Sequence, residues 1–283
     1  MRPLRTILTA LWQAWLRFDT DNGWAKASHV AMSMMLALFP FCIFTLSLAG
    51  QFSSELRIDD LIEFVYGAWP DQVAEPISRE VRAVLAQSGT GKTAFGAILA
   101  IFFASNGVDA VRSVVTDAFQ DKDPRPVCRQ RALCVIFVVA GAFLMAIVGG
   151  VVIGLPAYAG EPSVGAEGSR FGFLLGETLH NAVTMALLLL TVFACHAWLQ
   201  GVHHPAREVL PGLLLTLVLW IFAGYGFSLC FSHFSSYSLT YAGLAGIMAA
   251  LVFLYLMAAI FVLCAEFNGR LRAIALAPGN RVV

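Results

Sequence analysis

The stretch VLPGLLLTLVLWIFAGYGFSLCFSHFSSYSLTYAGLAGIMAALVFLYLMAAIFVLCA, residues 209–265, contains no Asp, Glu, Lys or Arg over 57 positions. A helix needs about 20 mostly apolar residues to cross a bilayer, so this stretch is long enough for two spans. Its polar centre, residues 233–240 (HFSSYSLT), is a natural place to turn. The stretch therefore predicts two membrane-spanning helices joined by a polar loop.

The composition of the whole chain agrees with a membrane environment. Only 13% of its 283 residues are charged, whereas soluble proteins have about 25%. The mean hydropathy is +0.76. These values exclude a soluble enzyme domain and a disordered chain. The 18 basic and 18 acidic residues cancel, so no basic field exists for nucleic acid. We expect membrane lipids as partners, and we leave a protein partner and the oligomeric state open.

Four further charge-free runs lie at 27–54, 93–108, 132–160 and 178–206. The sequence thus predicts an all-α polytopic membrane protein, a single membrane domain over residues 1–283. Its six spans are expected near 30–51, 93–114, 132–154, 175–198, 209–231 and 242–265. Asp109 and Arg112 interrupt the second span. A re-entrant or partly buried helix is the alternative for that segment.

The distribution of basic residues predicts the orientation. With six spans, 13 of the 18 Lys and Arg residues fall on the side of the membrane that holds both termini. Basic residues favour the cytoplasmic side of a membrane. We therefore expect both termini in the cytoplasm, and the inner membrane of a bacterium as the location.

Two amphipathic helices are expected outside the spans. In residues 4–18, Leu4, Leu8, Leu11, Trp15 and Phe18 share one helical face. This pattern, flanked by arginines and without a signal-cleavage site, predicts a helix lying in the membrane interface. Within the outer loop, residues 52–92, Val73, Ile77, Val81, Val84 and Leu85 mark a second such helix.

Residues 86–93, AQSGTGKT, fit a relaxed phosphate-binding-loop pattern. Such a loop needs a strand before it and a helix after it to hold phosphates. Here an amphipathic helix precedes the segment, a span follows it, and the predicted location is outside the cytoplasm. We interpret it as a turn in which Thr93 caps the second span, and we expect no nucleotide and no other cofactor.

Three polar residues of the second span form the first candidate site. Asn106, Asp109 and Arg112 follow one another at steps of three, which brings them to nearby parts of one helical face. Charged groups at membrane depth are costly and usually face a cavity or a partner. A structural ion pair between Asp109 and Arg112 and a contact with a substrate or ion are the two interpretations.

The fourth span carries the second candidate, Glu177, His180 and Asn181. Glu-x-x-His spacing can ligate a metal in a helical bundle, but such sites need a second set of ligands. A polar start of the helix at the interface is the plainer interpretation, and no metal site is predicted. The six cysteines form no CxxC pair, so neither a zinc module nor a disulfide framework is expected.

The third candidate is the pair Glu266 and Asn268, where the sixth span is expected to end. Glu266 either reaches the headgroups or faces inward and pairs with Arg112 or another cation across the bundle. We predict that it forms one polar cluster with Asp109 and Arg112. Small residues in 242–250 allow another helix to approach closely. Pro40 and Pro211 are possible kinks.

Several segments resemble the YihY/BrkB family of bacterial inner-membrane proteins. They are residues 27–40 (ASHVAMSMMLALFP), 123–126 (DPRP), 210–212 (LPG), 237–246 (YSLTYAGLAG) and 264–268 (CAEFN). The resemblance runs over nearly the whole chain, with ordered but diffuse motifs. The chain departs from the family pattern at Cys264, where glycine is usual, and at Ala242-Gly243.

This resemblance implies a six-span inner-membrane protein. Members have been called ribonuclease BN or a virulence factor linked to serum resistance, and a link to envelope lipid transport has been suggested. Phosphodiester hydrolysis needs positioned metal carboxylates or acid–base pairs, and the short cytoplasmic loops offer none, so we expect no catalytic residues and no enzyme. A transporter or flippase-like carrier for a lipid or envelope-related substrate is the favoured function. A non-transporting membrane scaffold, acting as an envelope assembly factor or a virulence-associated factor, is the alternative.

Overall fold

The computed structural model describes residues 2–52, 70–86, 93–119, 123–158, 169–199, 202, 204–233 and 244–276. Within these residues every regular element is an α-helix and no strand occurs, as the sequence predicts. The helices are α1 (Arg2–Thr20), α2 (Gly23–Phe52), α4 (Asp71–Ala86), α5 (Thr93–Ala118), α6 (Val127–Tyr158), α7 (Ser169–Ala197), α8 (Ala206–His233) and α9 (Leu244–Leu276).

The six predicted spans fall on α2, α5, α6, α7, α8 and α9, in that order. Four segments of the described chain are long and apolar enough to cross a membrane: Ile98–Ala118, Val127–Val148, Ala206–Cys230 and Gly246–Leu276. A shorter apolar segment, Met185–Ala197, belongs to α7. The chain is therefore a membrane protein with several apolar helices. Asp109 and Arg112 do not shorten α5, which runs through both of them.

Helix α9 is longer than predicted. It runs to Leu276 instead of ending near residue 265, so Glu266 and Asn268 lie inside the helix. The residues after Ala265 include good helix formers and no proline before Pro278. Apolar side chains on this extension, including Phe267 and Leu271, pack against α1. Packing and propensity together carry the helix beyond its uncharged part.

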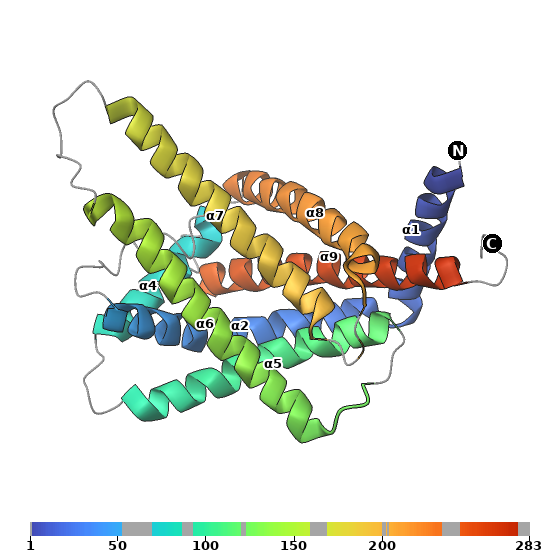
Figure 1. Cartoon of the computed structure of the whole chain (residues 1–283), viewed down its shortest axis with the longest axis horizontal. Coiled ribbons are helices and arrows are strands. Elements are labelled where there is room, and N and C mark those ends of the chain that lie inside the picture. Colours follow the sequence, from blue (N-terminus) through green and yellow to red (C-terminus); the bar gives the residue numbers. More distant parts are fainter. Residues whose placement is uncertain are drawn as a thin grey trace.

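Helices α2, α5 and α9 lie side by side at the centre of the bundle (Figure 1). Small buried residues line their contacts, among them Ala31 on α2, Ala110 on α5 and Ala258 on α9. A Cβ added at Gly269 of α9 would collide with the carbonyl oxygen of Ala118 at the end of α5. These small side chains let the three backbones approach closely.

Helix α1 crosses the end of α9 that leads to the C-terminus (Figure 1). Its buried face holds Ala10, Ala14 and Phe18. The opposite face exposes large apolar side chains, including Leu8 and Trp12, each 64% exposed. An amphipathic helix at this position was predicted. The turn into α2 passes through Asn22, whose φ of 56° is a left-handed value that Asn tolerates.

The amphipathic helix predicted in the outer loop is α4. Its Val73, Ile77 and Val81 are buried against the first part of α9, which includes Ala250 and Phe253. The side chains of Val84 and Leu85 and residues 52–70 lie mostly outside the described part of the chain. The buried positions repeat every four residues, which explains why one face of α4 packs on the bundle.

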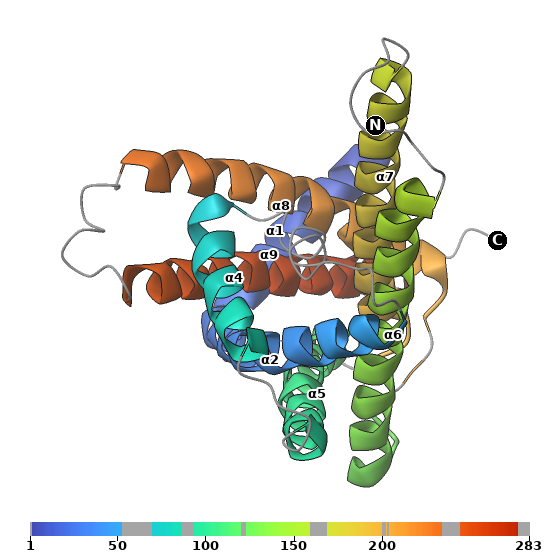
Figure 2. The ribbon, with the colours of Figure 1, turned by 90° about the vertical axis from the view of Figure 1, so that its left-hand side faces the viewer.

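Helices α6 and α7 run steeply across α8 and α9 (Figure 2). The surfaces of α6 and α8 expose many large apolar side chains, such as Ile136, Ile221 and Phe222, which are 61% to 70% exposed. A water-facing surface rarely carries contiguous apolar area of this kind. Lipid is its natural solvent.

Candidate functional site

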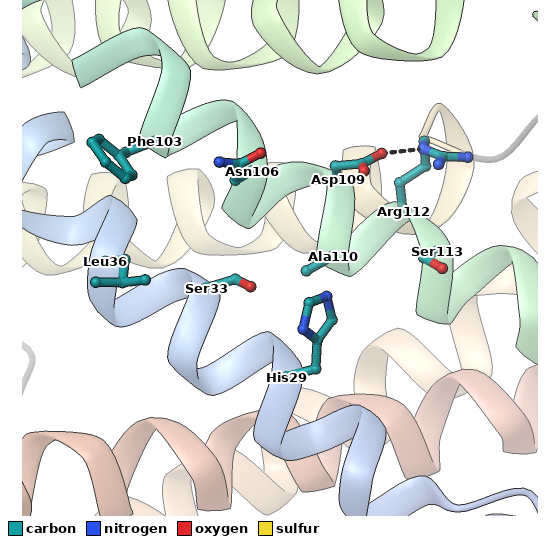
Figure 3. A pocket seen from close by; sticks show the side chains of 9 residues that line it. All are labelled: His29, Ser33, Leu36, Phe103, Asn106, Asp109, Ala110, Arg112 and Ser113. Atoms are coloured by element: carbon teal, nitrogen blue, oxygen red, sulfur yellow. Dashed lines mark hydrogen bonds and ion pairs between the residues drawn. The ribbon is translucent and has the colours of Figure 1, made fainter. Parts of the chain in front are cut away.

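A groove between α2 and α5 is the candidate site (Figure 3). Its volume is about 380 Å³. The lining residues are His29, Ser33 and Leu36 from α2, and Phe103, Asn106, Asp109, Ala110, Arg112 and Ser113 from α5. The first predicted group, Asn106, Asp109 and Arg112, thus faces one cavity. The α5 wall of the groove lies within the apolar segment Ile98–Ala118, so its polar groups lie beside apolar ones.

The polarity of the groove changes along its length. Helices α2 and α5 are antiparallel, so His29 lies near Ser113 and Leu36 lies near Phe103 (Figure 3). We call the end of the bundle where α2 begins and α5 ends the basic end, after Arg17, Lys26 and Arg112. The groove is polar toward the basic end and apolar away from it.

Gly107 allows the two walls to meet beside the groove. A Cβ at Gly107 would lie 3.1 Å from the Cβ of Ala37 and 3.4 Å from the carbonyl oxygen of Ser33. Any larger side chain there would push α2 and α5 apart. Glycine on α5 and alanine on α2 therefore set the separation of the groove walls.

Arg112 connects the groove to the loop between α5 and α6. Its Nε donates to Asp109 Oδ1 at 2.8 Å and its Nη1 donates to Asp123 Oδ2 at 3.0 Å. Arg125 donates to both oxygens of Asp123 at 2.9 Å, and its Nη2 also reaches the carbonyl oxygen of Leu199 at 2.8 Å. This network holds the guanidinium of Arg112 and ties the loop to the end of α7.

Asp123 is the central carboxylate of the network and is only 6% exposed. It lies in the loop, beyond the apolar segments. The hydrogen bonds from Arg125 hold the pKa of its carboxyl below the ordinary value, and the charge of Arg112 acts in the same direction. The group is therefore a carboxylate at neutral pH.

Glu266 faces inward and pairs with a cation, but that cation is not Arg112, so the predicted cluster of Glu266 with Asp109 and Arg112 is wrong. Glu266, 2% exposed, faces Arg17 of α1, with 3.3 Å between Arg17 Nε and Glu266 Oε2. Arg17 also donates to Asp21 and to the carbonyl oxygens of Asp117 and Ala118 at the end of α5. Because α9 continues beyond Glu266, the carboxylate faces α1, which packs there, and two polar groups form instead of one.

Asn268 fixes the start of α8. Its Oδ1 accepts a hydrogen bond from the Gly212 N–H at 2.7 Å, and its Nδ2 donates to the carbonyl oxygen of Val209 at 2.9 Å. Pro211 has no N–H and disturbs the helical hydrogen bonds around it. The buried amide of Asn268 bonds the neighbouring backbone groups. This role is structural.

The second predicted group remains a prediction. Glu177, His180 and Asn181 fall on α7, but their side chains lie outside the described residues, as do residues 87–92 of the phosphate-loop-like segment. Helix α4 precedes that segment and α5 follows it. In the described residues no group of three or more His, Cys, Asp or Glu side chains could hold a metal ion. Five cysteines of that same part are free.

Three polar residues of the groove were not predicted: His29, Ser33 and Ser113. His29 and Ser33 lie four positions apart on α2, and Ser113 lies four positions after Asp109 on α5. This spacing places each pair on one helical face. Polar pairs at that spacing inside otherwise apolar helices were the available signal.

Comparison with known proteins identifies the family. A family model described as virulence factor BrkB matches residues 14–277. The chain belongs to the BrkB family. Its relatives include YfkH of Bacillus subtilis (strain 168), whose name calls it ribonuclease-like, at 26% identity over 90% of this chain and 92% of the relative.

Further BrkB-like relatives are named UPF0761 membrane proteins. The protein of Cronobacter sakazakii is 25% identical over 90% of this chain and 85% of its own length, and that of Alteromonas mediterranea is 22% identical over 89% and 84%. No solved structure matches the chain. The family resemblance expected from the sequence is confirmed.

Proposed function

We propose that this BrkB-family chain is a six-span carrier of an amphiphilic envelope lipid in a bacterial inner membrane, with both termini in the cytoplasm. The basic end then faces the cytoplasm. The distribution of Lys and Arg supports this orientation, because 13 of 18 lie on the side of the termini. Neither enzymatic nor nuclease activity is part of the proposal.

The observation that carries the proposal is the gradient of polarity in the groove. His29 and Ser113 lie at one end, and Leu36 and Phe103 lie at the other. An amphiphile has the same gradient, a polar headgroup followed by apolar chains. Its headgroup would occupy the polar end while its chains continue along the apolar end into the surrounding lipid.

The structural context of residues 86–93 bears on the energy source of the proposed carrier. The segment at 86–93 lies between two helices instead of after a strand, so it lacks the context of a phosphate-binding loop. Movement of the substrate is therefore passive, coupled to an ion, or driven by a partner protein.

Lipid movement in vesicles tests the proposal. Purified protein is reconstituted with a fluorescent phospholipid, and dithionite, which does not cross the bilayer, quenches the label in the outer leaflet. We expect wild type to bring the inner-leaflet label outward faster than protein-free vesicles do. A non-transporting scaffold would give the protein-free rate, and that result would refute the carrier.

A groove-filling variant locates the path. Ser33→Trp fills the groove from α2 and should slow the movement severalfold. Ser228→Trp is the matched control, because Ser228 is also partly buried but lies on α8, away from the groove. Equal rates in the two variants, with equal melting temperatures, would exclude the groove as the path.

A further inference from the structure

The wall of the groove favours one class of headgroup. We propose that it binds the headgroup of a zwitterionic lipid that carries a primary ammonium and a phosphate. This inference rests on the proposed function, because it names the substrate class of the same groove. The charge and hydrogen-bonding capacity of six side chains of the groove support it.

The carboxylate of Asp109 offers a place for a cation. Its side chain is 40% exposed. Its Oδ1 accepts from Arg112 Nε at 2.8 Å and lies 3.8 Å from the thiol sulfur of Cys134. Within the described part of the chain, Oδ2 has no hydrogen-bond partner. An ammonium group in the groove can therefore bind this oxygen.

Neutral acceptors lie on both sides of Asp109. Asn106 lies about one turn before it on α5, Ser113 lies about one turn after it, and Ser33 lines the facing wall. A primary ammonium has three N–H donors, so a carboxylate oxygen together with amide and hydroxyl oxygens suits it. A quaternary ammonium has no N–H and would leave these acceptors without a donor.

The phosphate of the same headgroup has its own partners. Arg112 uses Nε for Asp109 and Nη1 for Asp123, while its Nη2 donates no hydrogen bond to the described residues. The imidazole of His29 lies at the polar end of the groove (Figure 3). Guanidinium and imidazole N–H groups are good donors to phosphate oxygens.

The total charge of the ion-pair network around Arg112 favours one class of lipid headgroup over another. Asp109, Arg112, Asp123 and Arg125 carry two negative and two positive charges and are linked by ion pairs. A zwitterionic headgroup leaves this balance unchanged. A headgroup with a phosphate and no amine adds a net negative charge next to the carboxylate of Asp109, and like charges at short distance repel one another.

Lipid binding to the purified full-length protein tests this inference. The protein is released from micelles that contain equal amounts of phosphatidylethanolamine, phosphatidylcholine and phosphatidylglycerol with identical acyl chains, and bound lipids are counted by native mass spectrometry. We expect phosphatidylethanolamine to exceed phosphatidylglycerol about tenfold in the first bound lipid, as one charge-assisted hydrogen bond would give. Equal binding of the three lipids would overturn the proposal.

Two variants assign the preference to Asp109. Asp109→Asn should remove most of the preference for phosphatidylethanolamine. Asp117→Asn is the matched control on the same helix, because Asp117 is exposed, pairs with Lys26 at 3.4 Å and lies outside the groove. If Asp109→Asn does not fold, Ser113→Ala, at an exposed groove position, should still reduce the preference. An unchanged preference in every folded groove variant would contradict the assignment.

Free phosphoethanolamine separates a lipid ligand from a soluble one. We expect free phosphoethanolamine to displace no bound lipid at a concentration at which added phosphatidylethanolamine displaces all of it. The apolar end at Leu36 and Phe103 contributes to lipid binding, and free phosphoethanolamine has no acyl chains to contact it. Displacement by free phosphoethanolamine at equal concentration would overturn the lipid assignment. An absence of lipid movement in the vesicles would refute the carrier function, but it would not change the ratio of bound phosphatidylethanolamine to phosphatidylglycerol. Loss of that ratio would refute only the headgroup assignment.

Discussion

Arg17 is the residue at which three helices meet. Its guanidinium, 9% exposed, contacts Glu266 on α9 and the last carbonyl groups of α5, while its backbone belongs to α1. A cation at the C-terminal end of a helix is favourable, because the carbonyl groups there carry partial negative charge. Arg17 thus fastens α1 to the end of the central bundle.

The first prediction concerns this ion pair. Arg17→Met should lower the free energy of unfolding by about 3 kcal/mol, because it leaves the buried carboxylate of Glu266 without its cation. Glu266→Met should cost less, because Arg17 keeps Asp21 and the carbonyl oxygens at the end of α5 as partners. The double variant should cost clearly less than the sum. Unfolding of the purified protein in denaturant measures all three, and additive effects would contradict a coupled pair.

Two controls accompany this double-mutant cycle of Arg17 and Glu266. Arg79→Met breaks the exposed pair with Glu75 on α4, whose side chains are 70% and 74% exposed, and should cost less than about 1 kcal/mol. A second cycle between Arg112 and Glu266 should be additive, since the two side chains have different partners.

The second prediction is a pH dependence at Asp123. The pKa of its carboxyl is lower in the folded protein than its ordinary value of 3.8. A lowered carboxyl pKa stabilises the fold above the ordinary pKa, and this contribution is lost as the pH falls through the folded value. Asp123→Asn should therefore cost about 2 kcal/mol at pH 7 and progressively less below about pH 4.

Melting temperatures of wild type and Asp123→Asn between pH 7 and pH 3 measure this effect. Asp21, whose pKa is also lowered by its hydrogen bond from Arg17, is present in both proteins and cancels in the difference. A difference that stays constant over the whole pH range would show that the carboxylate charge of Asp123 is unimportant.

Residue-level reasoning from the sequence found the ion pair of Asp109 with Arg112 but not the partners of Glu266 and Asp123. The spacing of Asn106, Asp109 and Arg112 predicts their common face, because helical geometry is local. The partner of Glu266 could not be predicted, since it depends on where α1 packs. One signal was present: Arg17 shares a helical face with Ala10 and Ala14, and small residues mark the buried side of α1.

At the scale of elements, glycine sets the contact between α9 and α5. Gly269→Ala should destabilise the protein by about 2 kcal/mol, because its Cβ would meet the backbone carbonyl of Ala118. Gly141→Ala on α6 is the matched control, since its added Cβ would meet no atom within 4 Å apart from the neighbouring backbone of its own helix. That change should be neutral or slightly stabilising. Thermal unfolding measures the stability of both variants. Equal changes in melting temperature would contradict the close packing of α9 on α5.

Helix existence was predictable and helix ends were not. Charge-free runs predict α2, α5, α6, α7, α8 and α9, because apolar length is a property of the sequence alone. The end of α9 was placed near residue 265, where charges begin, yet the helix continues to Leu276. Charges end an uncharged run but do not end a helix, and packing of Phe267 on α1 favours the extension.

At the scale of the whole molecule, the prediction is the topology. Reporter fusions after residues 75, 122, 165, 204, 237 and 283 should alternate between the outside and the cytoplasm, beginning outside. The segment Ile98–Ala118 separates the first two positions. Reporters after 75 and 122 on the same side would show that α5 does not cross the membrane, and the orientation of the basic end would then be wrong.

The most direct test of the groove is to find the lipid in it. A phospholipid with a photoactivatable group in its acyl chain is cross-linked to the reconstituted protein, and the labelled peptides are identified by mass spectrometry. If the groove binds lipid, we expect strong labelling near Leu36 of α2 and Phe103 of α5. This labelling should be lost in Ser33→Trp and kept in Ser228→Trp. Labelling spread evenly over the exposed faces of α6 and α8, unchanged by Ser33→Trp, would contradict it.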